Sequence, residues 1–312
     1  MISLLLCTVR DVGGLRDEPE KDPVLDIVEQ LAGQNYHDFE LVVVDGLHAK
    51  REAKVAEAAR KVGFRIRHVP PRSTLWTRNK KVAISTYRNT GISWARGELV
   101  VNLDDCCALP KNFVELFALA WKKYGIAAAM TWRSGGDNRP LGRVTLAGMV
   151  YGYSSFPLEA ALGLNGYDEA FDGAQGLEDM DWSTRLFNLR VPQAMVELGG
   201  FRLLPQTGHS PEAIDRGEPF VKCCNAAWQT QRVRRSIARA NKPEDWTPET
   251  LRSLVGPCQF LAPGDRCAHH HGQNPCAFIE HPWVRGLVPL TEAFLKEPPV
   301  VNLQQLRREN GL

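Results

Sequence analysis

Short apolar runs alternate with amphipathic stretches through the first part of the chain. Residues 2–8, ISLLLCT, form a continuous apolar run, which is typical of a central strand covered on both faces. An Asp-Pro pair at residues 22–23 then starts a stretch with helical spacing of apolar positions. The expected elements are a helix from residue 22, a strand at residues 39–44, a helix at residues 48–62 and a strand at residues 64–69. This alternation predicts right-handed crossovers and a parallel sheet.

The stretch at residues 88–110 ends a helix and then enters an apolar strand at residues 99–103. Asp104 and Asp105 follow this strand directly. Ligands of open α/β sheets bind outside the carboxyl ends of the strands, so this acidic pair is suited to hold a divalent cation and, through it, a diphosphate. A simpler interpretation is that the two acids begin a turn and cap the helix that starts near Pro110.

The chain lacks the common glycine-rich phosphate loops. Residues 8–14 do not match G-x-G-x-x-G, and G-x-x-x-x-G-K-[ST] does not occur, so neither a dinucleotide fold nor a P-loop is supported. A bound diphosphate would therefore need another counter-charge. Asp104 and Asp105 with a metal ion would supply it, helped by Arg88 on the preceding helix.

Four blocks resemble, in order and spacing, the GT-A glycosyltransferases and their family 2 in particular. The blocks are ISLLLCTVR, FELVVVDG, YRNTGISWARGELVVNLDD and GLNGYDEAFDGAQGLEDMDWSTRL, within roughly residues 1–210. The last block also resembles the carboxyl-terminal half of galactosyl- and N-acetylgalactosaminyl-transferase catalytic domains. The resemblance implies an α/β, Rossmann-like GT-A fold with a mainly parallel sheet flanked by helices. It also implies a nucleotide-sugar donor, and Mn²⁺ or Mg²⁺ as cofactor.

The resemblance further implies donor-binding roles for single residues. Thr8 would line the nucleotide pocket, with Arg10 beside it, and Asp45 would contact the base. Arg88 would lie near the diphosphate.

The metal site implied by the resemblance centres on the acidic pair. Asp104 would sit near the ribose and the metal, and Asp105 would ligate the metal. Family members often carry a further acid after this pair, whereas this chain has Cys106, which leaves one ligand fewer. In several GT-A enzymes a histidine after the second acidic motif completes the metal site, and His209 falls at a similar place. The alternative for His209 is a residue without a task.

A second acidic cluster, Glu178 and Asp179, follows a glycine-containing approach at residues 173–177. An inverting transferase needs a carboxylate that takes the acceptor's proton, and Asp179 is our candidate, with Glu178 as the second choice. Either acid could instead hold a donor hydroxyl, or simply favour the first turn of a helix. Trp182 could stack on an acceptor sugar, but aromatic burial favours a place in the core.

The resemblance stops near residue 215, where the composition changes. Residues 229–242 form a basic helical run with no acids of its own, and Arg232 and Arg235 are its candidate acceptor contacts. An anionic glycan or a nucleic acid with a hydroxymethylated base would suit such a run, and a solvated helix face is the alternative. We therefore divide the chain into a catalytic domain at residues 1–214 and a helical, loop-rich appendage at residues 215–312.

The appendage carries spaced cysteines and histidines that are suited to a structural zinc site. The spacing is weakly similar to a cysteine-rich family that chelates zinc or iron, and free thiols or disulfides are the alternatives. The candidate ligands are Cys224, Cys258, Cys267 and Cys276, with His271 or His269 as a substitute.

Composition sets only outer limits. The 312 residues are 44% hydrophobic with a net charge of +2, as in ordinary globular proteins. No apolar run approaches the roughly 20 residues that span a membrane, so we expect a cytoplasmic protein.

The leading hypothesis is a metal-dependent glycosyltransferase that moves a sugar from a nucleotide donor, with UDP-sugars favoured, to a hydroxyl acceptor with inversion. One alternative is a nucleotidyltransferase acting on a sugar phosphate, because Gly13 and Gly14 form a faint glycine loop after the first strand. The other is a non-enzymatic, zinc-stapled nucleic-acid-binding protein that uses the basic helix, for which steep salt dependence of binding is expected.

Overall fold

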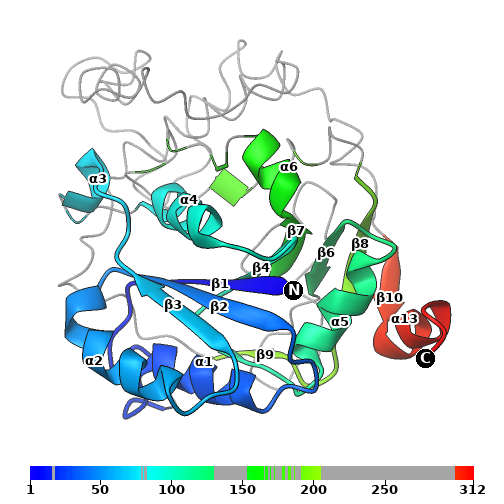
Figure 1. Cartoon of the computed structure of the whole chain (residues 1–312), viewed down its shortest axis with the longest axis horizontal. Coiled ribbons are helices and arrows are strands. Elements are labelled where there is room, and N and C mark those ends of the chain that lie inside the picture. Colours follow the sequence, from blue (N-terminus) through cyan, green and yellow to red (C-terminus); the bar gives the residue numbers. More distant parts are fainter. Residues whose placement is uncertain are drawn as a thin grey trace, which may run out of the picture.

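An eight-stranded sheet organises the chain, with the strand order β10-β8-β6-β7-β4-β1-β2-β3 (Figure 1). β1 lies between β2 and β4 and is parallel to both, and β3 continues the parallel pairing beyond β2. β7 alone runs antiparallel to its neighbours β4 and β6. The strands are β1 (Ile2–Thr8), β2 (Phe39–Asp45), β3 (Arg65–Val69), β4 (Leu99–Leu103), β6 (Ile126–Ala129), β7 (Ser154–Pro157), β8 (Gln193–Glu197) and β10 (Val300–Asn302). The mainly parallel α/β sheet expected from the sequence is confirmed.

The computed structural model describes the sheet and most of its flanking helices. The described residues are 1–15, 18–78, 80, 83–129, 153–164, 166–167, 169, 172, 178–179, 182–183, 186, 191–204 and 299–312. Three groups of candidate residues lie outside them. These are the candidate metal ligand His209, the candidate acceptor contacts Arg232 and Arg235, and the candidate zinc ligands Cys224, Cys258, Cys267, Cys276, His269 and His271. Among the described residues, no helix combines the length and apolar character that a membrane span requires.

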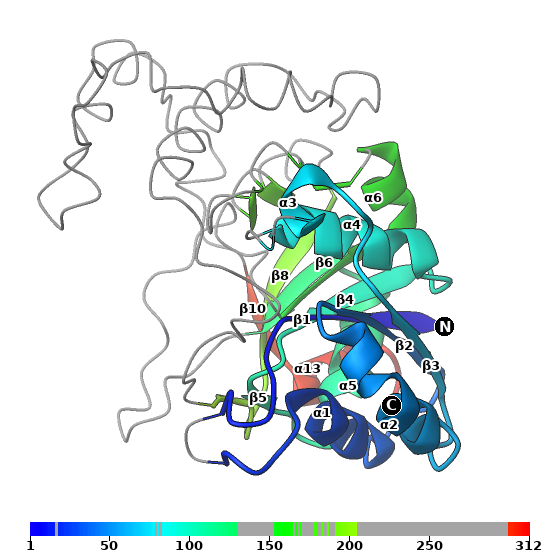
Figure 2. The same ribbon diagram turned by 90° about the vertical axis from the view of Figure 1, so that its left-hand side faces the viewer.

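Helices cover both faces of the sheet (Figure 2). One face packs on α1, α2, α5 and α13 through a core that includes Leu4, Leu41 and Val101, and the other packs on α4 and α6 through Leu5, Val42 and Val100. The helices are α1 (Pro23–Ala32), α2 (His48–Ala59), α3 (Leu75–Arg78), α4 (Ile84–Trp94), α5 (Phe113–Trp121), α6 (Leu158–Gly163) and α13 (Leu303–Glu309). Because both faces are covered, the central strands are buried along their length and mostly apolar, as the sequence pattern indicates.

A side-chain cap explains where α1 begins, whereas α5 has none. Asp22 precedes α1 and its Oδ1 accepts a hydrogen bond from the Val24 amide at 3.0 Å, as the Asp-Pro start predicts. α5 begins at Phe113, and the residue at its cap position is Asn112. Neither Asp104 nor Asp105 caps α5, so the capping role considered for this acidic pair is wrong.

The last described residues complete the sheet rather than standing apart from it. β10 pairs in parallel with β8, and the helix α13 that follows packs against α5. Arg307 pairs with Glu115 at 2.7 Å, and Lys123 pairs with Glu309 at 2.9 Å. The sequence division assigned these residues to the appendage, and the short strands β8 and β10 were not predicted. The boundary at residue 214 stays a prediction, because most of the appendage lies outside the described residues.

The turn between α4 and β4 depends on a glycine. A Cβ on Gly97 would lie 2.5 Å from the backbone nitrogen of Ser3, so no side chain fits there. The Gly97 amide donates to Ser3 Oγ at 2.8 Å, and Ser3 Oγ donates to the buried Glu40 carboxylate at 2.8 Å. These contacts fix the start of β4 against the starts of β1 and β2.

Replacing Gly97 with alanine should lower the free energy of unfolding by about 2 kcal/mol, because backbone atoms of β1 must move to admit the methyl group. Urea or thermal unfolding measures the change. Gly63→Ala is the matched control, since a Cβ there meets no atom within 4 Å and should change stability by less than about 1 kcal/mol. Equal stability of the two variants would contradict the close approach at Gly97.

Candidate functional site

Parallel pairing brings the carboxyl ends of three neighbouring strands to one edge. Thr8 ends β1 opposite Asp45 at the end of β2, and Asp104 and Asp105 follow β4 on the other side of β1. Arg10, two residues after β1, completes a group that we name the strand-end cluster: Thr8, Arg10, Asp45, Asp104 and Asp105. The structure thus brings together five candidate residues taken from three sequence blocks.

Both carboxylate oxygens of Asp105 accept hydrogen bonds within this cluster. Its Oδ2 accepts from Thr8 Oγ1 at 2.5 Å and its Oδ1 accepts from Arg10 Nε at 2.7 Å, and the residue is 6% exposed. Burial acts to lower the pKa of Arg10, but the Asp105 charge and hydrogen bond raise it above its usual value. Asp105 therefore fixes a buried, charged guanidinium at the end of β1.

Asp104 is the more accessible of the two acids and is half-buried. Burial first, and then the charge of Asp105, raise the pKa of Asp104. The charges of Arg88 and Arg10, together with a hydrogen bond from Tyr153, act in the opposite direction. A carboxylate in such surroundings gains from a nearby cation.

The donor set decides how the cluster could hold Mn²⁺ or Mg²⁺. Cys106 stands where an acid often occurs in the family, and burial raises the pKa of its thiol to about 12, so it is a neutral thiol rather than a ligand at neutral pH. Within the part of the chain that the structure describes, no three histidine, cysteine or acidic side chains gather as a metal site. The residues fit an ion that takes one carboxylate, Asp104, and fills its other positions with diphosphate and water oxygens. The predicted ligation by Asp105 stays a prediction, and its two hydrogen bonds compete with it.

At the end of β2, a second network surrounds Asp45. This carboxylate has no exposed surface and accepts from the Leu47 amide at 2.7 Å, Arg51 Nη1 at 2.9 Å and His68 Nε2 at 3.0 Å. Burial acts to raise its pKa, and the His68 hydrogen bond and the Arg51 charge lower it below the usual value. Any contact between Asp45 and the nucleotide base therefore has to form while these three hydrogen bonds are kept.

Arg51 was not singled out from the sequence, where it is one of several basic residues on a polar helix. It is 1% exposed, and besides Asp45 it binds Asp22 Oδ2 at 2.9 Å and the backbone oxygen of Arg10. The loop that follows β1 is thereby tied to the end of β2. No local pattern marks this role, because its partners lie 6, 29 and 41 residues away.

Helix α4, which packs on β1 and β2, carries Arg88. Arg88 Nη1 lies 3.2 Å from Glu178 Oε1, and its guanidinium carbon lies 4.9 Å from the centre of the Tyr167 ring. Arg88 also acts on the pKa values of Asp104 and Cys7. It therefore lies between the strand-end cluster and the second acidic pair, Glu178 and Asp179.

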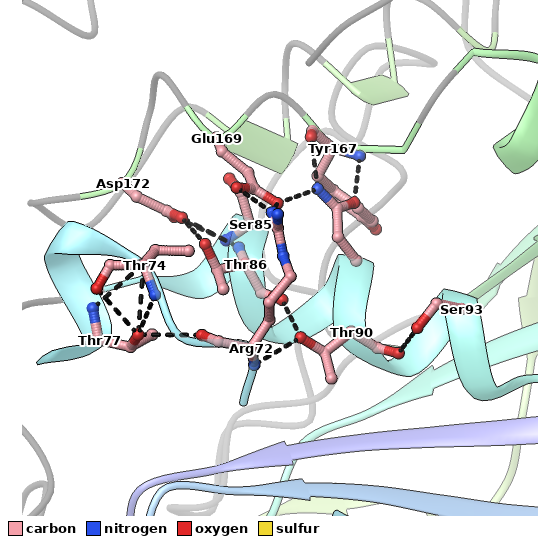
Figure 3. Close-up of polar contacts among 11 residues, drawn as sticks. Arg72, Thr74, Thr77, Ser85, Thr86, Thr90, Ser93, Tyr167, Glu169 and Asp172 are labelled. Atoms are coloured by element: carbon pink, nitrogen blue, oxygen red, sulfur yellow. Dashed lines mark hydrogen bonds and ion pairs between the residues drawn. The ribbon is translucent and has the colours of Figure 1, made fainter. Parts of the chain in front are cut away.

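The same helix holds the segment that leads to the second acidic pair (Figure 3). The Asp172 carboxylate accepts from the Ser85 amide at 2.8 Å, the Thr86 amide at 3.0 Å and Thr86 Oγ1 at 2.6 Å. Asp172 thus caps α4 from a distant part of the chain. Burial, followed by the charge of Glu169, raises its pKa well above the usual value. The sequence interpretation missed this residue, because nothing local links it to α4.

Glu178 and Asp179 differ in exposure. Glu178 is buried and paired with Arg88, whereas Asp179 is partly exposed. Trp182 has no exposed surface and packs between Tyr167, at 4.6 Å, and Phe156, at 5.2 Å between ring centroids. Its predicted place in the core is confirmed, and stacking of its face on an acceptor sugar is not supported by a fully covered ring.

Comparisons with solved structures give the same fold. The structure of S. aureus TarS 1-349 in complex with UDP-GlcNAc matches with a TM-score of 0.56 and 12% identity, over 81% of this chain and 70% of that chain. The same TarS fragment in complex with UDP matches with a TM-score of 0.51 and 13% identity, over 81% and 69%. At such identities the similarity concerns the fold. Among curated proteins, none matches the chain.

A family comparison matches the chain from a point shortly before α1 to a point beyond the second acidic pair. The model of glycosyl transferase family 2 matches residues 18–187, which is more than half of the 312 residues. The matched part contains Asp45, Arg88, Asp104, Asp105 and Asp179. The chain belongs to glycosyl transferase family 2.

Proposed function

We propose that this glycosyltransferase moves a sugar from a UDP-sugar to an acceptor hydroxyl with inversion at the anomeric carbon. One observation carries the proposal: Arg88 contacts the second acidic pair through Glu178 and interacts through its charge with Asp104 of the strand-end cluster. The complexes of the similar TarS fold with UDP-GlcNAc and with UDP support a uridine nucleotide as the donor class. Family membership argues against the nucleotidyltransferase and non-enzymatic hypotheses.

The strand-end cluster would receive the diphosphate. Arg10, fixed by Asp105, provides a positive charge that needs no rearrangement as the leaving group becomes more negative. A divalent cation at Asp104 would add further positive charge to the departing diphosphate. Thr8 is held by its bond to Asp105 and lines the same edge.

The second acidic pair would act on the acceptor. Transfer with inversion requires a base that accepts the hydroxyl proton while the oxygen attacks the anomeric carbon. Glu178 is buried, whereas Asp179 is partly exposed, so an acceptor hydroxyl reaches Asp179 more easily and Asp179 is the better candidate for this role. The anionic acceptor suggested by Arg232 and Arg235 stays a prediction, since both residues lie outside the described part of the chain.

Asp179→Asn should reduce sugar transfer by about 10²-fold or more, because an amide cannot accept the proton. UDP affinity, measured by titration calorimetry, should stay within about threefold of wild type, because Asp179 lies on the acceptor side. Product analysis by mass spectrometry with a panel of nucleotide sugars and hydroxyl acceptors measures transfer, and Glu159→Gln on the exposed surface of α6 is the matched control. Undiminished transfer by Asp179→Asn would remove it as the base, and a wild-type protein that binds no UDP would overturn the donor assignment.

Cys106→Asp should tighten Mn²⁺ binding to the UDP complex by about tenfold or more, because it adds a carboxylate beside Asp104. Titration of free Mn²⁺ followed by electron paramagnetic resonance measures the affinity without any turnover. Cys106→Ser has a similar volume and no charge, so it should bind Mn²⁺ as wild type does. Equal affinity in the two variants, both shown to be folded by circular dichroism, would mean that position 106 does not face the cation.

A further inference from the structure

Arg88 contacts the second acidic pair and also influences the strand-end cluster. We infer that Arg88 is a positioning residue that holds Glu178, and with it Asp179, against the donor site, rather than a direct ligand of the diphosphate. This inference rests on the proposed function. It revises the role that the family resemblance implies for Arg88.

The guanidinium of Arg88 is enclosed by partners on several sides. Its side chain is 12% exposed, with Glu178 Oε1 at 3.2 Å and the face of the Tyr167 ring at 4.9 Å. A guanidinium stacked on an aromatic ring and paired with a carboxylate is restricted in both direction and rotation. Leaving Glu178 to follow a diphosphate would expose a buried carboxylate without its counter-charge, which is strongly unfavourable.

Tyr167 is itself held in place, so the surface under Arg88 is fixed. Its hydroxyl accepts from Asn102 Nδ2 at 3.0 Å, and its ring stacks on Trp182 at 4.6 Å with an angle of 26° between the planes. Its backbone nitrogen donates to Asn89 Oδ1 at 2.7 Å, and its backbone oxygen accepts from Asn89 Nδ2 at 2.8 Å. Arg88 and Asn89, adjacent on α4, therefore both contact Tyr167, one at its ring and the other at its backbone.

The contacts between Asn89 and Tyr167 leave no space for a side chain at position 166. Gly166 has a φ of +74°, and a Cβ there would lie 2.2 Å from Asn89 Oδ1. Asp172 adds three hydrogen bonds from the start of α4, and Glu169 binds Asn89 Nδ2 at 2.9 Å and also Arg72 (Figure 3). The segment before the second acidic pair is thus attached along the first half of α4.

The charged and titratable groups that interact with Arg88 in the described part of the chain come from several elements. They are Cys7 of β1, Asp104 after β4, Tyr167 of the attached segment, and Glu178 and Asp179 of the second acidic pair. The charges of Tyr167, Glu178 and Asp179 raise the pKa of Arg88 against the opposing effect of burial. By reciprocity, the Arg88 charge favours the ionised form of Asp179, which is the form that a base requires.

Arg88→Gln in the full chain tests the inference, with Arg88→Lys as the conservative variant. The proposal expects transfer to fall about 10²-fold in kcat, since small displacements of a catalytic group have effects of that size. The acid limb of the pH profile of kcat should move up by about one unit, because Asp179 loses a nearby positive charge. The Kd for UDP, measured by titration calorimetry, should change less than threefold, and Arg88→Lys should restore most of the pH profile but not all of kcat.

Arg72→Gln is the matched control, because it removes an exposed arginine that pairs with Glu169 on the attached segment and leaves the buried pair between Arg88 and Glu178 in place. An exposed ion pair contributes little to stability. Its pH profile should remain that of the wild type. A tenfold or larger loss of UDP affinity in Arg88→Gln, with an unmoved pH profile, would overturn the inference and assign Arg88 to the diphosphate.

Hydrogen exchange without any ligand separates this inference from the proposed function. Amides of residues 166–186 should exchange faster in Arg88→Gln than in wild type and Arg72→Gln, because the segment loses a buried attachment. Unchanged exchange in all three proteins would overturn the positioning role even if the enzyme proves active. Faster exchange in Arg88→Gln, together with a wild-type protein that binds no UDP, would support the positioning role of Arg88 and reject the donor assignment instead.

Discussion

The in-register parallel pairing of β1 with β2 and β4 is the constraint on which the site depends. It fixes Thr8 opposite Asp45 and places the start of the acidic pair one step beyond the end of β4. Several polar groups at this edge are buried and face charged neighbours. Three arginines meet this condition, each bound to a carboxylate that reaches it from another element.

These arginines have different roles around the strand ends. Arg51 ties the loop after β1 to the end of β2, Arg10 is fixed by Asp105, and Arg88 connects α4 with the second acidic pair. A buried pair adds little stability compared with an apolar replacement, but the loss of one member leaves an uncompensated charge. The network therefore specifies geometry more than it stabilises the fold, which is what a preorganised site requires.

The sequence predicted the fold where local signals are strong. Continuous apolar runs located β1, β2 and β4, and the Asp-Pro start located α1. β8 and β10 were missed because β8 begins and ends on polar residues, and because β10 has only three residues, too few to show a pattern. The acids of the site could be found from their position after strands, but the partners of Asp105, Asp45 and Asp172 are brought close by folding alone.

The placement of β10 bears on how the protein folds during synthesis. β8 pairs with β6 on one side and with β10 on the other, and β10 is made about a hundred residues after β8. While the ribosome is still translating the residues between them, β8 has an open edge that could pair with another nascent chain. The edge of β8 is therefore covered only when β10 and α13 have been made. A polypeptide truncated before β10 would keep the catalytic residues but expose an aggregation-prone strand.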